Sequence, residues 1–213
     1  MNQEESSRLR REYELAGLGV EDLAATPMAQ FEVWFAGALA ADLYEANAFV
    51  LSTTGREGFP SARAVLLKET TERSLIFYTN LESRKSQEIK ENPHVAATFM
   101  WLPLHRQVRF EGEARLVADE VADAYFETRP RGAKIAAHSS RQSRPAANRE
   151  ELESVFAERD ASFGDEIPRP EWWGGWEIFP HTAEFWQGRF NRFHDRLRYV
   201  QKGDDWIVER LQP

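Results

Sequence analysis

The run Arg192-Phe193-His194-Asp195-Arg196 has the clearest chemical potential in the sequence. Side chains of a β-strand alternate between its two faces, so on a strand Arg192, His194 and Arg196 share one face. Such a face suits an anion or an electron-rich ring, and the adjacent cations disfavour protonation of His194. The alternative is an exposed polar face whose cations pair with carboxylates of a neighbouring strand.

Two more cations, Arg63 and Lys68, flank the apolar run Ala-Val-Leu-Leu. They have opposite parity, so on a regular strand they face opposite sides and serve different groups, for instance the phosphates of two ligands. A β-bulge would change that relation. Solvated cations at the ends of a strand would produce the same pattern.

Ser83-Arg84-Lys85 lies at the start of a predicted helix, where free N–H groups and the helix dipole favour an anion. Two cations at this end of a helix are otherwise unfavourable for the helix, so their presence indicates a bound phosphate. The alternative is a charge pair on the surface. Gln107 offers both a donor and an acceptor to a heterocycle, although a strand glutamine satisfied by its neighbours fits equally well.

The composition excludes several kinds of chemistry. The 213 residues include no cysteine, so disulfides, thiolate nucleophiles and cysteine-based metal sites are excluded, and redox chemistry requires a bound group. The histidines show no metal-ligand spacing, and glycine motifs for dinucleotides are absent. A formal net charge of −8 disfavours nucleic-acid binding, whereas local clusters of Arg and Lys suit a small phosphate ester.

The sequence also predicts where the protein works. No apolar run approaches the roughly 20 residues that span a bilayer, and the N-terminus lacks the features of a signal peptide. We therefore expect a cytoplasmic protein that binds no membrane. Since there is no internal repeat and no clear boundary, we expect one domain over residues 1–213.

Periodicity and turn residues predict many short strands with helices between them. Thr26-Pro27 starts a helix, residues 49–79 form a β-meander, and Lys202-Gly203-Asp204 is a hairpin turn. The predicted helices span residues 26–44, 83–91, 119–128 and 149–163, with a loop at 139–148, and the predicted strands span 49–53, 61–68, 74–79, 94–101, 106–117, 176–179, 182–187, 192–201 and 206–211. This pattern is typical of an α+β fold centred on a closed or split barrel, because closure removes exposed sheet edges.

Together and in this order, these fragments resemble the pyridoxamine 5′-phosphate oxidase family. The fragments that carry the resemblance run from Leu9-Arg-Arg-Glu-Tyr13 through RAVLLK (63–68), FYTN (77–80), SRK (83–85), RQV (106–108), YFxxRPR (125–131), RQS (141–143), WGG (173–175), EFWQG (184–188) and NRFHDR (191–196) to the terminal ERLQP. The resemblance covers nearly the whole chain.

The resemblance implies an antiparallel, Greek-key-like, FMN-binding split β-barrel with flanking helices. It further implies a homodimer with the flavin between the subunits. The residues that match the family's FMN contacts are Arg63, Lys68, Tyr78, Thr79, Arg84, Lys85, Gln107, Gln142, Ser143, Trp186 and Arg196.

The resemblance also implies the substrate side. Lys68, Tyr125 and Arg129 are expected to hold the substrate phosphate, and Arg192 and His194 to face the pyridine ring as the catalytic residues. Arg10 and Tyr13 match residues that close over the site, within an expected mobile segment at 1–20. The implied reaction transfers a hydride from C4′ of pyridoxamine or pyridoxine 5′-phosphate to the flavin, forms pyridoxal 5′-phosphate, and reduces O₂ to H₂O₂.

Three departures from the family pattern concern substrate preference. Ala133 replaces the usual serine, a loss of one neutral hydrogen bond that typically costs about 0.5–1.5 kcal/mol, and His138 and Arg189 are also unusual. One alternative is a flavin oxidase of the phenazine-biosynthesis type, which would not need the phosphate grip. The other is a non-catalytic FMN-binding protein, which would not need Arg192, His194 and Arg129.

Overall fold

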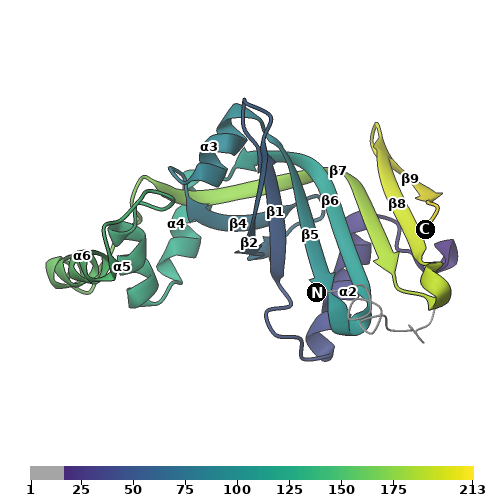
Figure 1. The fold of residues 1–213 in the computed structure, drawn as a ribbon, viewed down its shortest axis with the longest axis horizontal. Helices are drawn as coiled ribbons and strands as arrows, with labels where there is room; N and C mark the ends of the chain where they lie inside the picture. Colours follow the sequence, from purple (N-terminus) through teal and green to yellow (C-terminus); the bar gives the residue numbers. More distant parts are fainter. Residues whose placement is uncertain (1–16) are drawn as a thin grey trace, which may run out of the picture.

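A computed structural model describes residues 17–213 (Figure 1). The two expected closing residues, Arg10 and Tyr13, lie outside this range, as does most of the segment at 1–20. Within residues 17–213 the strands form one nine-stranded antiparallel sheet that curls into an open half-barrel. The strands are β1 (Ala48–Thr54), β2 (Pro60–Leu66), β3 (Glu69–Thr70), β4 (Leu75–Asn80), β5 (His94–Trp101), β6 (Arg106–Leu116), β7 (Trp173–Gln187), β8 (Asp195–Lys202) and β9 (Asp205–Arg210).

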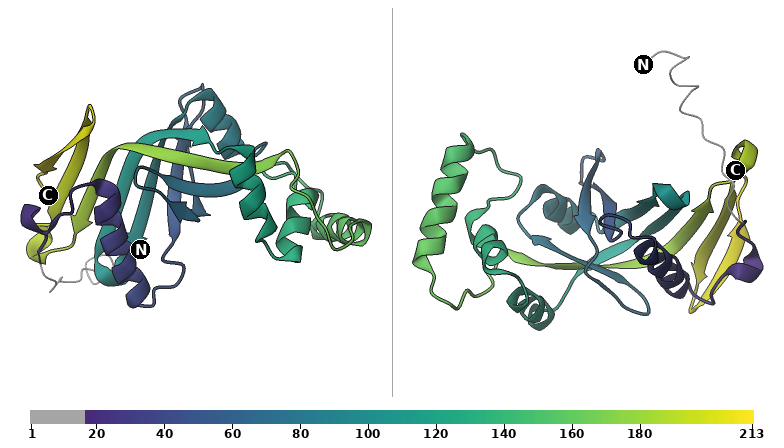
Figure 2. Two further views of the ribbon diagram at one scale, coloured as in Figure 1. Left: turned by 180° about the vertical axis from the view of Figure 1, so that it is seen from behind. Right: turned by 90° about the horizontal axis from the view of Figure 1, so that it is seen from below.

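The helices lie around this sheet, one against its concave face and the others at its margins. They are α2 (Pro27–Ala40), α3 (Arg84–Glu91), α4 (Asp119–Glu127), α5 (Arg131–Ser139) and α6 (Arg149–Ser162), with short 3₁₀ turns at Val20–Asp22, Leu102–Leu104 and Phe190–Arg192. Helices α4 to α6 lie at one end of the molecule, and the β8–β9 hairpin lies at the other (Figure 2).

The order of strands is β2-β1-β5-β6-β7-β4-β3, and β8 pairs with β7 and with β9. The predicted β-meander over residues 49–79 is therefore wrong: β1 and β2 form a hairpin, but β4 pairs with β7 instead of β2. The sequence periodicity identified the strands but not their partners, which are distant in sequence. Because the sheet curls, β4 nevertheless comes to lie beside β2, across the opening of the half-barrel.

Strand β7 is longer than predicted, since the two strands expected at 176–179 and 182–187 are one. Its first half pairs with β4 and its second half with β8, while β6 follows nearly its whole length. The register with β6 shifts between Glu111 and Gly112, where the chains approach closely. A Cβ on Gly112 would lie 2.1 Å from the Phe179 carbonyl oxygen, so this bulge requires glycine.

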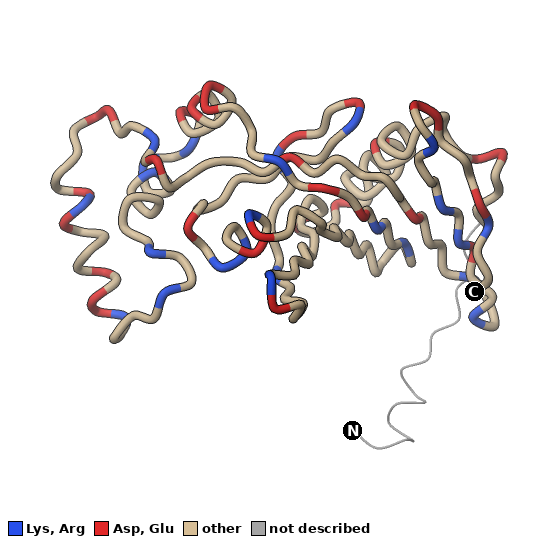
Figure 3. Tube along the Cα trace, turned by 90° about the horizontal axis from the view of Figure 1, so that it is seen from above, with Lys and Arg blue, Asp and Glu red and all other residues tan. Residues whose placement is uncertain are grey.

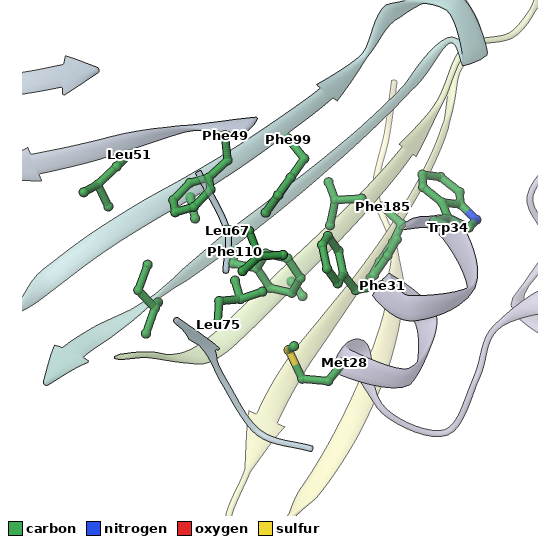
Figure 4. Packing of buried hydrophobic residues seen from close by; sticks show 14 of the residues in the cluster. Met28, Phe31, Trp34, Phe49, Leu51, Leu67, Leu75, Phe99, Phe110 and Phe185 are labelled. Atoms are coloured by element: carbon green, nitrogen blue, oxygen red, sulfur yellow. The ribbon is translucent and has the colours of Figure 1, made fainter. Parts of the chain in front are cut away.

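The main core lies between the concave sheet and helix α2. Phe31 of α2 is fully buried against Phe99 and Phe110, and Trp34 packs edge-on against Phe185 (Figure 4). Thr26 caps the helix by accepting the Ala29 N–H, as the sequence predicted. The helix ends at Ala40 instead of Tyr44, because the chain turns there through the positive φ of Asp42.

A smaller core joins helices α4 and α5 to the start of β7 through Phe126, Ala137 and Trp173. Helices α4 and α6 agree with the predicted ranges to within one residue, whereas α5 was not predicted. Arg131 connects α5 to the end of α6 by donating to the carbonyl oxygens of Asp160 and Phe163. This helical end of the molecule carries several of the predicted site residues.

Candidate functional site

A pocket of about 530 Å³ opens between strands β2 and β4 and the start of α3. It is lined by Ser61, Ala62, Arg63, Ala64, Val65, Leu66, Lys68, Tyr78, Thr79, Arg84, Lys85, Gln142 and Ser143. Eight of these residues were predicted from the sequence as cofactor contacts. Figure 3 shows Lys and Arg in separate groups along the chain, interspersed with Asp and Glu, and this pocket brings four of these cations together.

The expectation that Arg63 and Lys68 face opposite sides is wrong, because both line this pocket. That they serve different groups, such as the phosphates of two ligands, stays a prediction. Strand β2 ends at Leu66, so the regular alternation of side chains does not extend to Lys68. Beyond the strand, the Lys68 N–H donates to the Ile76 carbonyl oxygen on β4. The turn toward β4 thus places two cations of opposite parity around one cavity.

Lys85 is a buried cation at the base of the pocket. Its Nζ lies 2.9 Å from Thr79 Oγ1 and 2.7 Å from Gln142 Oε1. Burial, and secondarily the charge of Arg63, lowers the pKa of Lys85 to about 8. No carboxylate is paired with this ammonium among the described residues, so an anion in the pocket would relieve its desolvation.

The start of α3 contributes backbone donors to the same pocket. Ser83 is the N-cap residue, as predicted, but its side chain does not cap the helix: Ser83 Oγ donates to the Asn80 carbonyl oxygen. The hydroxyl at the helix start comes from Ser143, whose Oγ accepts the Arg84 N–H at 3.2 Å. Ser143 adopts a φ of 72°, and its hydroxyl lies at the N-terminus of α3.

Three aromatic rings stack beside the pocket. Tyr78 and Tyr125 are parallel, with ring centroids 4.0 Å apart, and Trp173 continues the stack 5.4 Å from Tyr78. A Cβ on Gly175 would lie 2.8 Å from the Tyr78 ring, so glycine allows this close packing. Burial and a hydrogen bond to Glu69 raise the pKa of Tyr78, which keeps the phenol neutral.

Arg129 lies over this stack, with its guanidinium carbon 4.6 Å from the centroid of Trp173. Burial lowers the pKa of Arg129, and its Nη1 is a buried nitrogen without a hydrogen-bond partner in the described part of the chain. A buried, unsatisfied guanidinium nitrogen is costly unless an acceptor reaches it. The structure therefore joins the predicted substrate residues Tyr125 and Arg129 to the pocket through Tyr78.

A second group of predicted residues lies on the outer face of the sheet. Gln107, Trp186 and Arg196 are neighbours in register across β6, β7 and β8. Val108 and Phe185, the adjacent positions along β6 and β7, are fully buried in the core, so this row faces outward. The structure thus separates the predicted cofactor residues into two groups.

Glu184 organises this outer group and was not predicted. It is 3% exposed, accepts from Arg196 Nε at 2.7 Å, and accepts from Arg109 Nη2 at 2.6 Å. The hydrogen bond from Arg196 raises the pKa of that arginine and fixes its side chain on the sheet. The role of Glu184 depends on arginines of the two neighbouring strands, β6 and β8, and these strand partners could not be predicted from the sequence.

The prediction that Arg192 and His194 lie on a regular strand is wrong. Strand β8 begins at Asp195, and Phe190–Arg192 forms a 3₁₀ turn in which Asn191 and Arg192 have φ values of 54° and 61°. Positive φ breaks the alternation on which a shared strand face depends. The positions of Arg192 and His194 are instead set by this turn and by the contacts of His194.

His194 contacts both its own loop and the outer group. Its Nδ1 accepts the Arg189 N–H at 3.0 Å, and its ring centroid lies 4.5 Å from that of Trp186. The neutral imidazole therefore carries its proton on Nε2. Burial, and secondarily the charge of Arg192, lowers the pKa of His194, in the direction that the sequence predicted.

The three departures from the family pattern have different surroundings. His138 bonds to the Pro168 carbonyl oxygen and packs on Phe163, within the helical end of the molecule. Arg189 forms an ion pair with Asp195, 3.5 Å apart. Ala133 lies in the first turn of α5, where its N–H donates to the Pro130 carbonyl oxygen.

The two groups of predicted residues lie on different faces of the chain. Arg63 pairs in register with Leu51, a fully buried residue, and so belongs to the inner face of the sheet. Gln107 belongs to the outer face of β6, and strands β1 and β5 separate β6 from β2.

Among residues 17–213, no cluster of three or more His, Cys, Asp or Glu residues has the geometry to hold a metal ion. No helix in this range is long and apolar enough to cross a membrane.

Two families match the chain along most of its length. The family described as pyridoxamine 5′-phosphate oxidase matches residues 35–161. The family described as pyridoxine 5′-phosphate oxidase C-terminal dimerisation region matches residues 173–213. The first match includes the pocket residues on β2, β4 and α3 and Gln107 of the outer group, and the second includes Trp186 and Arg196.

Similar proteins and structures agree with these matches. The pyridoxine/pyridoxamine 5′-phosphate oxidase of Rubrobacter xylanophilus is 53% identical and covers 96% of this chain and 95% of its own, and that of Bordetella petrii is 48% identical over 97% and 99%. The crystal structure of PhzG from Burkholderia lata, in complex with tetrahydrophenazine-1-carboxylic acid, has a TM-score of 0.89 at 29% identity and covers 95% of this chain and all of its own. An FMN-binding protein from Nostoc punctiforme, 17% identical with a TM-score of 0.74 and covering 90% and 100%, shares the fold. The chain therefore belongs to the pyridoxamine 5′-phosphate oxidase family of oxidoreductases.

Proposed function

We propose that this protein oxidises pyridoxamine 5′-phosphate and pyridoxine 5′-phosphate to pyridoxal 5′-phosphate, with FMN as cofactor, O₂ as electron acceptor and H₂O₂ as by-product. The observation that carries the proposal is the convergence of Arg63, Lys68, Arg84 and Lys85 on one pocket beside Tyr125 and Arg129. A site with two phosphate-binding regions suits a phosphorylated cofactor next to a phosphorylated substrate.

The pocket residues fit FMN. Its phosphate would be held by Arg63, Arg84 and Lys85, together with the Ser143 hydroxyl, since these groups surround the start of α3. The buried Lys85, without a carboxylate partner in the described range, supports a bound anion independently of the charge count. When bound, FMN supplies a two-electron acceptor that O₂ can reoxidise.

We further propose a homodimer in which each FMN lies between two subunits. The pocket group of one subunit would meet Gln107, Trp186 and Arg196 of the other, because one chain presents these groups on opposite faces of its sheet. The match of residues 173–213 to a dimerisation region supports this arrangement. Gln107 brings a donor and an acceptor to the flavin ring, and Arg196, fixed by Glu184, brings a charge.

Lys68, Tyr125 and Arg129 would hold the substrate phosphate, with Arg129 Nη1 as the strongest candidate donor. Arg192 and His194 would orient the pyridine ring, and neither has to act as a nucleophile. The lowered pKa of His194 keeps its imidazole neutral, so it can donate from Nε2 to a polar substituent of the substrate. Arg10 and Tyr13 complete the proposal as residues that close over the site.

The structural similarity to PhzG makes a phenazine-type oxidase the second candidate. The buried Nη1 of Arg129 and its neighbour Tyr125 favour a phosphorylated substrate over a phenazine precursor. A non-catalytic FMN-binding protein would have no use for this grip.

The test is aerobic incubation of the FMN-loaded protein with pyridoxamine 5′-phosphate and, separately, with pyridoxine 5′-phosphate. We expect pyridoxal 5′-phosphate and H₂O₂ to form in equal amounts. Tight FMN binding without oxidation of either substrate would refute the proposed reaction and leave a changed substrate or a binding role.

A further inference from the structure

Glu88 is a buried acidic residue that contacts Arg63 and Arg84, two of the cations that line the pocket. It lies on α3, is 8% exposed, and receives hydrogen bonds from three different elements. Its Oε2 accepts from Thr53 Oγ1 at 2.6 Å and from Ser61 Oγ at 2.5 Å, and it lies 3.3 Å from Arg63 Nη2. Its Oε1 accepts from Arg84 Nε at 2.8 Å.

These contacts connect the two guanidinium groups expected at the cofactor phosphate. Arg63 lies on β2, which is an edge strand, and Arg84 begins α3. The Glu88 carboxylate therefore links β2 to α3, and no backbone pairing connects these two elements. Arg63 Nη1 also donates to Leu51 O and Thr53 Oγ1 of β1, and its Nη2 donates to Ser61 Oγ of β2, so the guanidinium group is held against both strands.

We propose that Glu88 is a positioning residue, which holds the guanidinium groups of Arg63 and Arg84 in the geometry that binds the FMN phosphate. This inference rests on the proposed FMN site. Glu88 is not expected to touch the phosphate itself, because two carboxylate oxygens and a phosphate dianion repel each other.

The protonation state of Glu88 supports this role. Burial alone would raise its pKa, but hydrogen bonds from Ser61, Thr53 and Arg84, and the charge of Arg84, lower the pKa to about 2. The carboxylate is therefore ionised at neutral pH and accepts hydrogen bonds on both oxygens. A neutral amide at the same position would present an N–H₂ group toward at least one guanidinium or hydroxyl.

Charge and position predict opposite effects of removing this carboxylate. By charge alone, Glu88 weakens binding of the dianionic phosphate, so Glu88→Gln would tighten FMN binding. If Glu88 instead holds the two guanidinium groups in place, the variant releases Arg63 and Arg84 and weakens FMN binding. We expect the second effect to prevail, because charge-assisted hydrogen bonds of fixed geometry are lost, and we expect the Kd for FMN to rise about 10- to 100-fold.

The experiment compares the affinities of the full-length apoprotein for FMN and for riboflavin, which lacks the phosphate. The variants are Glu88→Gln and Glu88→Asp, and the matched control is Glu91→Gln, on the same helix, where the exposed carboxylate accepts only the Arg56 N–H among the described hydrogen bonds. We expect both Glu88 variants to lose FMN affinity, to keep riboflavin affinity, and to leave the far-ultraviolet circular dichroism unchanged. Glu91→Gln should match the wild type.

Glu88→Asp keeps the charge and shortens the reach, so it separates position from charge and decides the matter if Glu88→Gln does not fold. Unchanged or tighter FMN binding by a folded Glu88 variant would overturn the inference, as would equal losses for FMN and riboflavin, which indicate a general structural role. If the wild type binds no FMN, the proposed cofactor fails first. If the wild type binds FMN without oxidising the substrates, only the proposed reaction fails, and the comparison of Glu88 variants still decides the inference.

Discussion

The guanidinium carbon of Arg129 lies over the Trp173 ring, 4.6 Å from its centroid, and Arg129 Nη1 is buried without a hydrogen-bond partner in the part of the chain described. The indole thus holds the cation in place while one of its donors stays available. In the proposed function, this donor would bind the phosphate of the substrate.

Replacing Arg129 with Gln should therefore raise the KM for pyridoxamine 5′-phosphate by about 10- to 100-fold, the usual cost of losing a charge-assisted hydrogen bond. The FMN affinity should stay the same. Steady-state kinetics and flavin titration check the two expectations, with Arg149→Gln, an exposed member of a surface ion pair with Glu153, as the control. An unchanged KM would remove Arg129 from the substrate site.

Replacing Arg192 with Ala should abolish most turnover while the purified protein stays yellow. The reason is that Arg192 lies in the turn beside His194, apart from the pocket that is proposed to hold the FMN phosphate. The measurement is kcat together with the visible absorbance of bound flavin. Turnover at the wild-type rate would exclude a catalytic role for Arg192.

FMN binding should weaken as the pH rises above about 8. In the free protein, burial lowers the pKa of Lys85 to about 8, and a bound phosphate dianion would raise it again. Protonation of Lys85 is thus coupled to binding, so the affinity is constant below the pKa of the free protein and falls above it, by up to about tenfold per pH unit.

Fluorescence titration of FMN between pH 6 and pH 10 measures this dependence. Lys85→Gln should bind FMN more weakly at neutral pH and lose this dependence. A wild-type profile that is flat across pH 8 would contradict the assignment of Lys85 to the phosphate.

Two variants with complementary defects should form functional FMN sites when their subunits are combined in one dimer. Lys85→Gln damages the pocket group, and Arg196→Gln damages the outer group, so each homodimer should bind FMN poorly. In a mixed dimer, one of the two sites receives both intact groups, and random mixing should make about a quarter of all sites functional. Flavin content and oxidase activity of the co-expressed chains measure this recovery.

Recovery in the co-expressed sample should disappear when the same two purified proteins are mixed without exchange of subunits. Failure to recover any FMN binding after verified exchange would show that both groups act within one subunit.

Local elements of the fold were predictable from the sequence, and their long-range partners were not. Strand β5 has the predicted bounds, because its alternation of buried and exposed residues is complete. Helix α5 was missed, since it begins directly after Pro130 and has no side-chain cap. The pairing of β4 with β7 joins residues about a hundred positions apart, a relation that periodicity does not contain.

The same division holds for the site. The residues of the pocket group were predicted by their resemblance to family motifs, but Glu88 and Glu184 had no local signal that distinguished them from surface carboxylates. Their roles depend on burial and on arginines from neighbouring elements. The turn at Arg192 was also unpredictable, because nothing in the sequence required a positive φ there.

Strand β7 contributes to both groups of site residues. Its Gly174 and Gly175 pair with Thr79 and Tyr78 of the pocket, while its other half carries Trp186 and Glu184 of the outer group. In the proposed dimer, one continuous strand would thus be a structural member of two different flavin sites. A shift of β7 along its axis would move residues of both flavin sites at once. The two sites of the dimer would thus be coupled through the backbone of a single strand.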